Sequence, residues 1–515
     1  MKYFLFIVVF FVSFGSRAQV NQTDIYELEK KNSDDYFTVL PADEAGVIIF
    51  RDTDNYKKGD LWQVVSLDTA LNERWNNELT IDGKYKFKGY DLKNSELYLL
   101  FRDGELEKSD YHLMAINILD GDVTRYDIKN EIALELSHIT MLSDRMILAG
   151  YVNLSPTLVD YKLGSDQFEV VPGFFKDRSN VVDLRGNNNG TFNVVTLEKD
   201  YEGTFLRLRT YSDEGDILFE REVQTADDYK LLSAKSSGFI DGNIAISGTF
   251  GLRNSKYAVG IYLAIVKPEG QKNLVKYFRF SDFEHFFDYM RPKRAARLRA
   301  KLARRTAKGK DFHYSSRLLL HEIRKSPRGF VLAAEIYDPD FKGYYGPGYY
   351  YGYIGQDQIE RDNRAAQSYA KHPSTLQNVD DADHFEYLES IIFELDKNGE
   401  LLWDNSFKIE DVETNTLEQV VQFSMEGDLI NMIYKTDEEL RFKTIQESQL
   451  VEEKNLPIKL INEYDKIIHT YKGTGKSEYW YGNNFLIWGY HKVENKVETE
   501  KRNRSVLFVN KVVFD

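Results

Sequence analysis

Residues 394–403, ELDKNGELLW, read as two short strands bent around a turn at Asp396, Lys397, Asn398 and Gly399. Apolar residues flank a cluster of turn-forming residues, which is the pattern of a β-hairpin. Weaker copies of this hairpin recur along the chain, at residues 66–79, 117–128, 162–171, 210–223 and 266–278. The sequence therefore contains an internal repeat.

An aromatic residue stands just after the turn in every copy of the hairpin. These residues are Trp75, Tyr126, Phe168, Phe219, Tyr277 and Trp403. They lie roughly 40 to 60 residues apart, except for one double-length gap before Trp403, and this spacing is the length of a four-stranded propeller blade. The repeat therefore predicts a β-propeller.

The segments between the hairpins supply the other strands of each unit. Between residues 84 and 119, for example, the candidate strands are KYKFKGYDL, SELYLLFRD and DYHLMAINIL, each rich in β-branched or aromatic residues and bounded by Asp, Asn or Gly. The same pattern fits residues 35–81, 134–174, 180–224, 229–280, 317–409, 417–460 and 464–515. These units predict eight blades, with seven as the alternative and two β-sandwich domains as the competing architecture.

The last unit offers only three convincing strands, within residues 464–515. Residues 22–30, QTDIYELEK, can supply the missing one. A strand from one terminus that completes the sheet of the other closes the ring and removes two exposed sheet edges. We therefore expect an all-β ring closed by an N-terminal strand.

The turn-plus-aromatic hairpin of residues 394–403 resembles the outer hairpin of PQQ-like (quinoprotein-type) propellers, and more broadly WD40-like repeats. In the quinoprotein pattern an Asp, a turn Gly and a Trp recur in every blade. The resemblance implies that Gly399 adopts a positive φ and that Trp403 packs between neighbouring blades. The adjacent quinone-binding cysteines of the dehydrogenases cannot exist here, because the chain has no cysteine. The resemblance thus supports the fold, implies no quinone cofactor, and disfavours an enzyme.

The first 18 residues have the features of a signal peptide. Lys2 precedes an apolar run at residues 3–14, and Ala18 ends the small-residue cleavage motif. We therefore expect residues 19–515 to form a single exported propeller domain that is soluble in the periplasm or outside the cell. The absence of cysteine excludes a disulfide framework, and the net charge of -15 argues against a general nucleic-acid binder.

Two insertions interrupt the repeat, at residues 281–316 and 341–384. The first follows the outermost strand of one blade, and the second lies between the second and third strands of the next. Antiparallel order places both connections at the same end of the ring. Long loops on a rigid scaffold often carry function, so this face is the candidate working surface.

The first insertion carries ten basic residues and no acidic one between Arg291 and Lys310, and its composition predicts a helix. The simplest interpretation is a solvated helix neutralised by the acidic body. The sharper one is an electrostatic dock for an acidic protein surface or for membrane headgroups. The candidate binding residues are Arg294, Arg297, Arg299, Lys301, Arg304 and Arg305.

The second insertion begins with a segment rich in tyrosine and glycine, FKGYYGPGYYYGYIG. Its candidate binding residues are Tyr344, Tyr345, Tyr349, Tyr350, Tyr351 and Tyr353. Tyrosine rings can stack on sugars or pack against proteins, although a loop that folds over the propeller without a ligand fits equally. Asp380, Asp381, Asp383 and His384 at its end do not match a metal-binding motif, so no metal site is predicted.

Two functional hypotheses follow from these features. The first is an exported non-catalytic propeller that acts as a protein-binding or scaffolding module of the cell envelope, with another envelope protein or an anionic surface as its partner. The alternative is a glycan-acting hydrolase or lyase that uses the tyrosine segment. No nucleophile or phosphate-binding motif appears in the sequence, and no catalytic residue is assigned.

Overall fold

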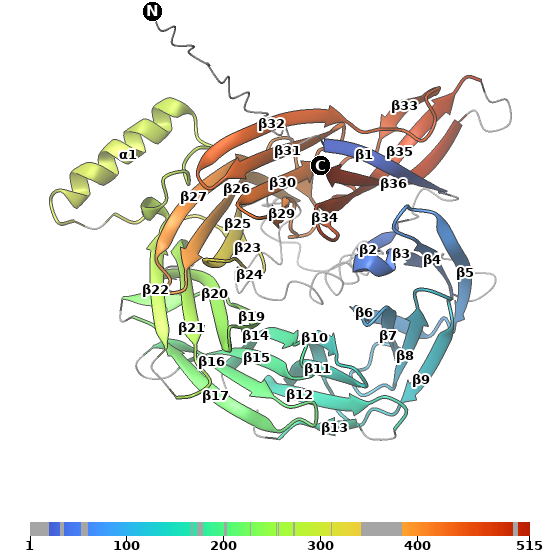
Figure 1. The fold of residues 1–515 in the computed structure, drawn as a ribbon. Coiled ribbons are helices and arrows are strands. Elements are labelled where there is room, and N and C mark those ends of the chain that lie inside the picture. Colours follow the sequence, from blue (N-terminus) through green and yellow to red (C-terminus); the bar gives the residue numbers. More distant parts are fainter. Residues whose placement is uncertain are drawn as a thin grey trace, which may run out of the picture.

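Eight antiparallel sheets stand radially around one axis in the computed structural model of the protein (Figure 1). The structure describes residues 20–515 except 31–35, 53–59, 166–167, 173–178, 200–202, 227, 254, 256, 271–272, 311, 341–383 and 498–502. The prediction of an eight-bladed β-propeller is therefore confirmed, and the seven-bladed and sandwich alternatives are wrong.

The first four blades each consist of four strands in sequence order, from the central axis outward. Their bounds are β2 Thr38–Pro41, β3 Val47–Asp52, β4 Asp60–Leu67 and β5 Glu73–Ile81; β6 Tyr85–Lys93, β7 Glu96–Asp103, β8 Tyr111–Asn117 and β9 Val123–Ile128; β10 Glu135–Met141, β11 Arg145–Val152, β12 Ser155–Lys162 and β13 Phe168–Val170; and β14 Ser179–Gly186, β15 Phe192–Lys199, β16 Thr204–Tyr211 and β17 Ile217–Gln224. A short 3-10 helix, η1 Asp43–Ala45, joins β2 to β3.

The fifth to eighth blades follow the same plan, but three of them have an interrupted innermost strand. Their bounds are β18 Tyr229–Leu231, β19 Lys235–Ile240, β20 Asn243–Leu252, β21 Ala258–Val266 and β22 Leu274–Arg279; β23 Leu318–Leu320, β24 Arg324–Lys325, β25 Gly329–Asp340, β26 His384–Asp396, β27 Leu401–Lys408 and the small β28 Glu413–Thr414; β29 Gln422–Glu426, β30 Leu429–Lys435, β31 Glu439–Gln446 and β32 Gln449–Pro457; and β33 Asp465–Thr470, β34 Ser477–Tyr479, β35 Asn484–Asn495 and β36 Asn503–Phe514. In the sixth blade the sequence pattern predicts one inner strand, whereas the ladder breaks between β23 and β24.

The N-terminal strand β1 (Val20–Glu29) is the outermost strand of the eighth blade. It pairs with β36 from Val20 opposite Phe514 to Glu29 opposite Val506, as the sequence predicts. The Arg504 guanidinium ties the sheet together, since it binds Glu27 Oε2 at 2.8 Å and Asp465 Oδ2 at 2.5 Å. Beyond β1, the Lys30 ammonium lies over the rings of Tyr36, Tyr471 and Tyr490 at 4.7 to 5.0 Å, which holds the end of β1 against the eighth blade. We call the pairing of β1 with β36, together with the ion pairs of Arg504, the seam.

The repeated hairpin forms for local reasons. In residues 394–403, Asp396 Oδ1 accepts hydrogen bonds from the N–H groups of Asn398 and Glu400, both at 2.8 Å, and Gly399 has a φ of +73°. Trp403 on β27 is buried between the sixth and seventh blades and donates to Glu394 Oε2 at 2.7 Å. Both expectations for the turn glycine and the aromatic residue are thus confirmed at this position.

The hydrophobic core is divided among the interfaces between adjacent blades. Each blade buries one side against its predecessor and the other against its successor, so the buried residues fall into a series of clusters around the ring. Because every sheet is covered on both sides, apolar burial in this cysteine-free chain runs continuously around the circle.

The basic insertion leaves the ring between the fifth and sixth blades. It contains a 3-10 helix, η2 (Phe280–Asp282), and the helix α1 (Pro292–Thr306), which stands outside the circle of sheets (Figure 1). It starts where β22 ends, opposite the beginning of β21, and the β25–β26 connection of the sixth blade opens at this same end of the ring. Residues 341–383 lie outside the described residues, as does the predicted signal peptide.

Candidate functional site

The segment that leads into α1 is anchored by aromatic residues. Phe280, Phe283, Phe286 and Phe287 are buried in the cluster between the fifth and sixth blades. Phe280 and Phe286 stack with ring centroids 4.3 Å apart, and Phe283 lies 4.9 Å from Phe393 of β26. This root, residues 280–290, holds the helix in a fixed position on the ring. We call the root and α1 together the arm.

One side of α1 faces the arm root. Ala295 is buried, and Leu298 and Leu302 are half-buried against the same cluster as the phenylalanines. Beside them, Arg299 Nη2 donates to Asp288 Oδ1 at 2.7 Å and to the Glu284 carbonyl at 2.9 Å. Arg299 therefore fastens the helix to the root through hydrogen bonds. The other predicted basic binding residues do not have this structural role.

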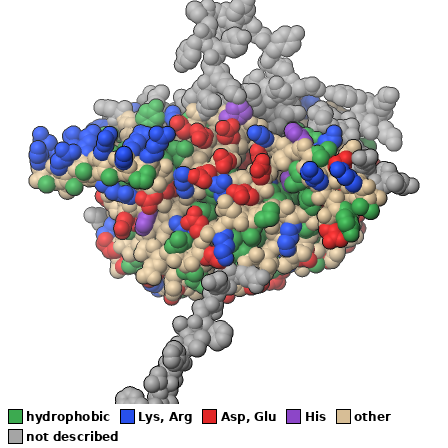
Figure 2. Space-filling model, turned by 90° about the horizontal axis from the view of Figure 1, so that it is seen from above, with side chains coloured by type: hydrophobic (Ala, Val, Ile, Leu, Met, Phe, Trp, Pro, Cys, Tyr) green, Lys and Arg blue, Asp and Glu red, His purple; other side chains and the backbone are tan. Residues whose placement is uncertain are grey.

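Next to the side that faces the root, α1 carries a row of exposed cations. At 3.6 residues per turn, six cations fall within about a third of the circumference of the helix, and all six are exposed: Lys293, Arg294, Arg297, Lys301, Arg304 and Arg305. Figure 2 shows Lys and Arg side chains gathered along one edge of the helix. We call these six residues the basic row.

Little in the described part of the chain neutralises the basic row. Lys301 lies 5.0 Å from the ring centre of Phe312, and Arg304 Nε donates to the Ala300 carbonyl at 3.2 Å. Among the described residues, no carboxylate forms an ion pair with Arg294, Arg297 or Arg305. The structure therefore brings five of the six predicted basic candidates onto one accessible surface.

Several charges of α1 oppose its stability. The first turn contains no acidic residue, although the N-terminal end of a helix favours negative charge. The pairs Lys293–Arg297 and Arg297–Lys301 place like charges four residues apart, where they repel. An exposed helix whose sequence served stability alone would be expected to intersperse glutamate on this side.

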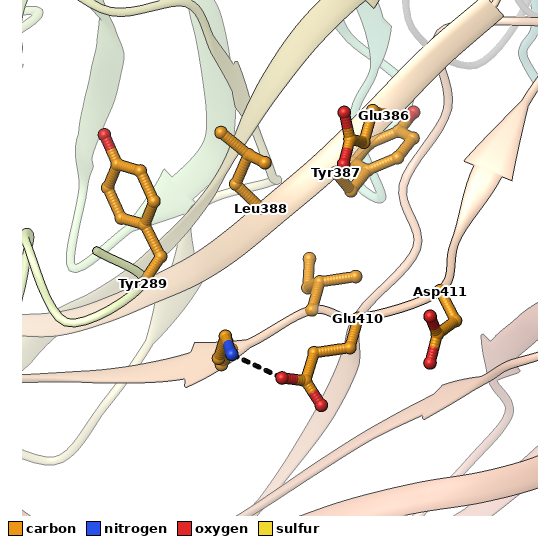
Figure 3. A pocket seen from close by; sticks show the side chains of 8 residues that line it. Tyr289, Glu386, Tyr387, Leu388, Glu410 and Asp411 are labelled. Atoms are coloured by element: carbon orange, nitrogen blue, oxygen red, sulfur yellow. Dashed lines mark hydrogen bonds and ion pairs between the residues drawn. The ribbon is translucent and has the colours of Figure 1, made fainter. Parts of the chain in front are cut away.

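A shallow hollow of about 420 Å³ lies beside the arm root (Figure 3). Its lining consists of Tyr289, Glu386, Tyr387, Leu388, Lys408, Ile409, Glu410 and Asp411. Lys408 pairs with Glu410, and Arg441 binds Glu410 Oε2 at 2.8 Å and Asp411 Oδ2 at 3.2 Å. Much of the acidic lining is thus neutralised by the protein itself.

A second hollow of about 210 Å³ adjoins the first and shares Glu386 with it. Asp338, Glu386 and Glu413 lie directly opposite one another on β25, β26 and β28. His384, at the end of the second insertion, bonds through Nδ1 to Asn415 Oδ1 at 2.8 Å. Within the described ranges, no group of three or more His, Asp or Glu side chains has the geometry of a metal site.

The carboxyl group of Glu389 is buried against the arm root. Glu389 on β26 is fully buried next to the root residues Asp288 and Tyr289. Burial raises its pKa to about 8, and the nearby Asp288 carboxylate acts in the same direction. Sequence reasoning missed this residue, because nothing local distinguishes it from the exposed Glu386 on the same strand.

His321, which directly follows β23 in the sixth blade, is buried. Its Nε2 lies 3.0 Å from Glu335 Oε1, and Glu335 also accepts hydrogen bonds from the N–H groups of Val420 and Val421 at 2.7 to 3.1 Å. This network joins the sixth blade to the seventh, so the pair is part of the scaffold rather than of an open site.

The other predicted binding residues cannot be placed. Tyr344, Tyr345, Tyr349, Tyr350, Tyr351 and Tyr353 lie outside the described residues, and so do Asp380, Asp381 and Asp383. The site that can be built from geometry is therefore the arm and the surface beside it.

Comparisons with known proteins identify no family for this chain. No family model and no curated protein sequence matches the chain. Among solved structures, the polysaccharide lyase Uly1 aligns over 84% of this chain and 90% of its own, with 9% identity and a TM-score of 0.40. The β-propeller domain of the Trilobed protease from Pyrococcus furiosus aligns over 84% and 94% at 8% identity and a TM-score of 0.35.

The Nup133 β-propeller domain of Vanderwaltozyma polyspora aligns over 83% of this chain and all of its own, at 9% identity and a TM-score of 0.36. At such identities these similarities concern the fold alone and give no information about substrate or partner. The closed ring of eight sheets by itself defines the chain as a β-propeller protein.

Proposed function

We propose that this protein is an exported, non-catalytic β-propeller that serves as a binding or scaffolding module of the cell envelope, with the arm as its docking element for an anionic surface. The ring supplies a rigid frame, and the arm presents charge at a fixed place on its rim. Export is proposed from the signal-peptide features of residues 1–18. Within the described part of the chain, no helix is long and apolar enough to span a bilayer.

One observation carries the proposal. In a chain of net charge -15, six exposed cations line one side of a helix, without acidic residues in the helix to balance them. Buried phenylalanines hold this helix in place. Electrostatic attraction between a fixed cationic row and an anionic partner steers encounter and sets orientation.

Fractionation of cells tests the proposal. The arm variant R294E/R297E/R305E reverses three cations of the basic row, and the control variant K108E/K129E/K162E reverses three exposed lysines of the second and third blades. Both change the net charge by the same amount. We expect the wild-type protein and the control variant to sediment with envelope material, and the arm variant to remain in the soluble fraction. Equal distribution of all three proteins would refute a docking role for the arm.

A further inference from the structure

The exposed side of α1 is uniform in its chemistry. The basic row consists of lysine and arginine, and the neighbouring exposed positions Ala296, Ala300 and Ala303 are small. We infer that the surface on which the arm docks is a lipid bilayer with anionic headgroups. This inference rests on the proposed docking role of the arm and names its partner.

A protein partner fits the exposed side less well. Specific protein interfaces are built around anchors that fill pockets, and arginine acts as such an anchor mainly beside aromatic or large aliphatic side chains. No aromatic residue occurs in α1, and its large aliphatic side chains, Leu298 and Leu302, are turned to the arm root. A row of cations without a pocket or an apolar centre suits a partner whose charges can rearrange laterally, as lipid headgroups do.

The geometry of α1 also suits a flat partner. The basic row extends from Lys293 to Arg305, which is roughly 18 Å at the rise of an α-helix. The helix stands outside the circle of sheets, and its cations lie along one edge (Figures 1 and 2). A planar surface can therefore meet the cations of the row together.

The packing of α1 against the arm root specifies how the arm would bind a bilayer. Amphipathic helices that insert into a bilayer bury an apolar face among the acyl chains. In this arm Ala295, Leu298 and Leu302 are already engaged with the root. Binding would therefore be peripheral and electrostatic, reversed by salt, and insensitive to the packing of the acyl chains.

The inferred lipid partner is tested with purified full-length mature protein and lipid vesicles. Vesicles of phosphatidylcholine alone are compared with vesicles containing phosphatidylglycerol, and the bound fraction is measured by co-sedimentation at low and at high salt. Each basic residue near an anionic surface contributes about a fivefold gain in partitioning. We therefore expect the arm variant to bind phosphatidylglycerol vesicles at least tenfold more weakly than the wild type, and the control variant to bind as the wild type does.

Circular dichroism and thermal unfolding of each variant establish that the fold is kept. If the arm variant misfolds, the neutral variant R294Q/R297Q/R305Q takes its place, and we expect it to bind with intermediate strength. The lipid assignment is overturned if binding is equal on neutral and anionic vesicles, survives 0.5 M salt, or does not depend on the arm. If vesicles are not bound but the arm still directs sedimentation with envelope material, the partner is a protein or another polyanion and the docking role stands. If neither depends on the arm, the proposed function fails as well.

Discussion

Glu389 shows how one side chain can link the ring to the arm. It lies on β26 beneath Asp288 and Tyr289 of the arm root, and Ser406 of β27 and Lys443 of β31 approach it from the ring. Since burial holds its pKa near 8, the carboxyl group is largely protonated at neutral pH, and its ionisation would place a charge beneath the root.

This pKa shift predicts a pH-dependent stability. A free glutamate loses its proton near pH 4.5, whereas folded Glu389 keeps its proton until about pH 8. Its contribution is therefore fully present below pH 4.5 and is lost as the pH rises to about 8, by roughly 1.4 kcal/mol per pH unit. In the variant E389Q this loss is absent, so the stability difference between variant and wild type should grow in favour of the variant from pH 5 to pH 8. Urea unfolding at several pH values measures it.

The exposed Glu386 on the same strand is the matched control. E386Q removes a carboxylate three residues away without touching a buried group, so its stability should follow the wild type across this pH range. If E389Q and E386Q behave alike, Glu389 does not titrate as its burial implies.

Arg504 provides a second prediction for a single residue. It binds Glu27 and Asp465, whose side chains are 9% and 0% exposed, and therefore compensates two buried carboxylates at the seam. Removal of one partner from a buried pair costs about 3–5 kcal/mol. We expect R504M to lose stability of this order in denaturant unfolding, and K84M, which breaks the exposed Lys84–Asp103 pair, to lose little. Similar small losses in both variants would mean that the pairs at the seam do not stabilise the closed ring.

At the level of elements, substitutions in α1 can distinguish a docking helix from a helix that is simply solvated. If its cations served the fold, their replacement would loosen the arm. If they oppose the fold, K293E should tighten it, because the new carboxylate lies at the helix N-terminus and four residues before Arg297.

Hydrogen exchange of the α1 amides measures this effect. The gain expected from an acidic residue in the first turn is about 0.3–1 kcal/mol. R305E makes the same change of charge in the last turn, where the helix dipole favours a cation, and should give a smaller gain or a loss. Faster exchange in K293E than in the wild type would show that the basic row stabilises the helix.

The strand β1 can be examined as an element in its own right. A chain that begins after Glu29 leaves the edge of β36 unpaired, and open edges of this kind invite association with other chains. We expect this truncated protein to self-associate in size-exclusion chromatography. A peptide of residues 20–30 should restore the monomer, whereas the same peptide with proline in place of Tyr26 should not. A truncated protein that stays monomeric without peptide would show that β1 is dispensable for closure.

At the level of the whole molecule, the fold could be predicted because its repeat is local. The turn of residues 394–403 is specified by Asp396 and Gly399 within five residues, and the first segments expected of the second blade, 84–92 and 95–103, correspond to β6 and β7 within one residue at each end. The basic row was visible for the same reason, since helical spacing orders it along one stretch of sequence.

What escaped prediction depends on residues that are distant in sequence. Glu389 is buried because the arm root folds over β26, about a hundred residues later in the chain. Arg504 joins Glu27 to Asp465 across almost the full length of the protein. Composition and spacing do not reveal contacts between residues that are distant in sequence. The ion pairs of Arg504 and the burial of Glu389 are therefore seen only in the assembled ring.

The pairing of β1 with β36 also sets an order of events during biosynthesis. β1 is synthesised before the strands of the first blade, whereas β36, with which it pairs, is synthesised after the first seven blades. Seven complete blades can form while the N-terminal strand waits, and the eighth cannot. A polypeptide that stops before β36 would lack the partner of β1, so the ring can close only after both strands have been made.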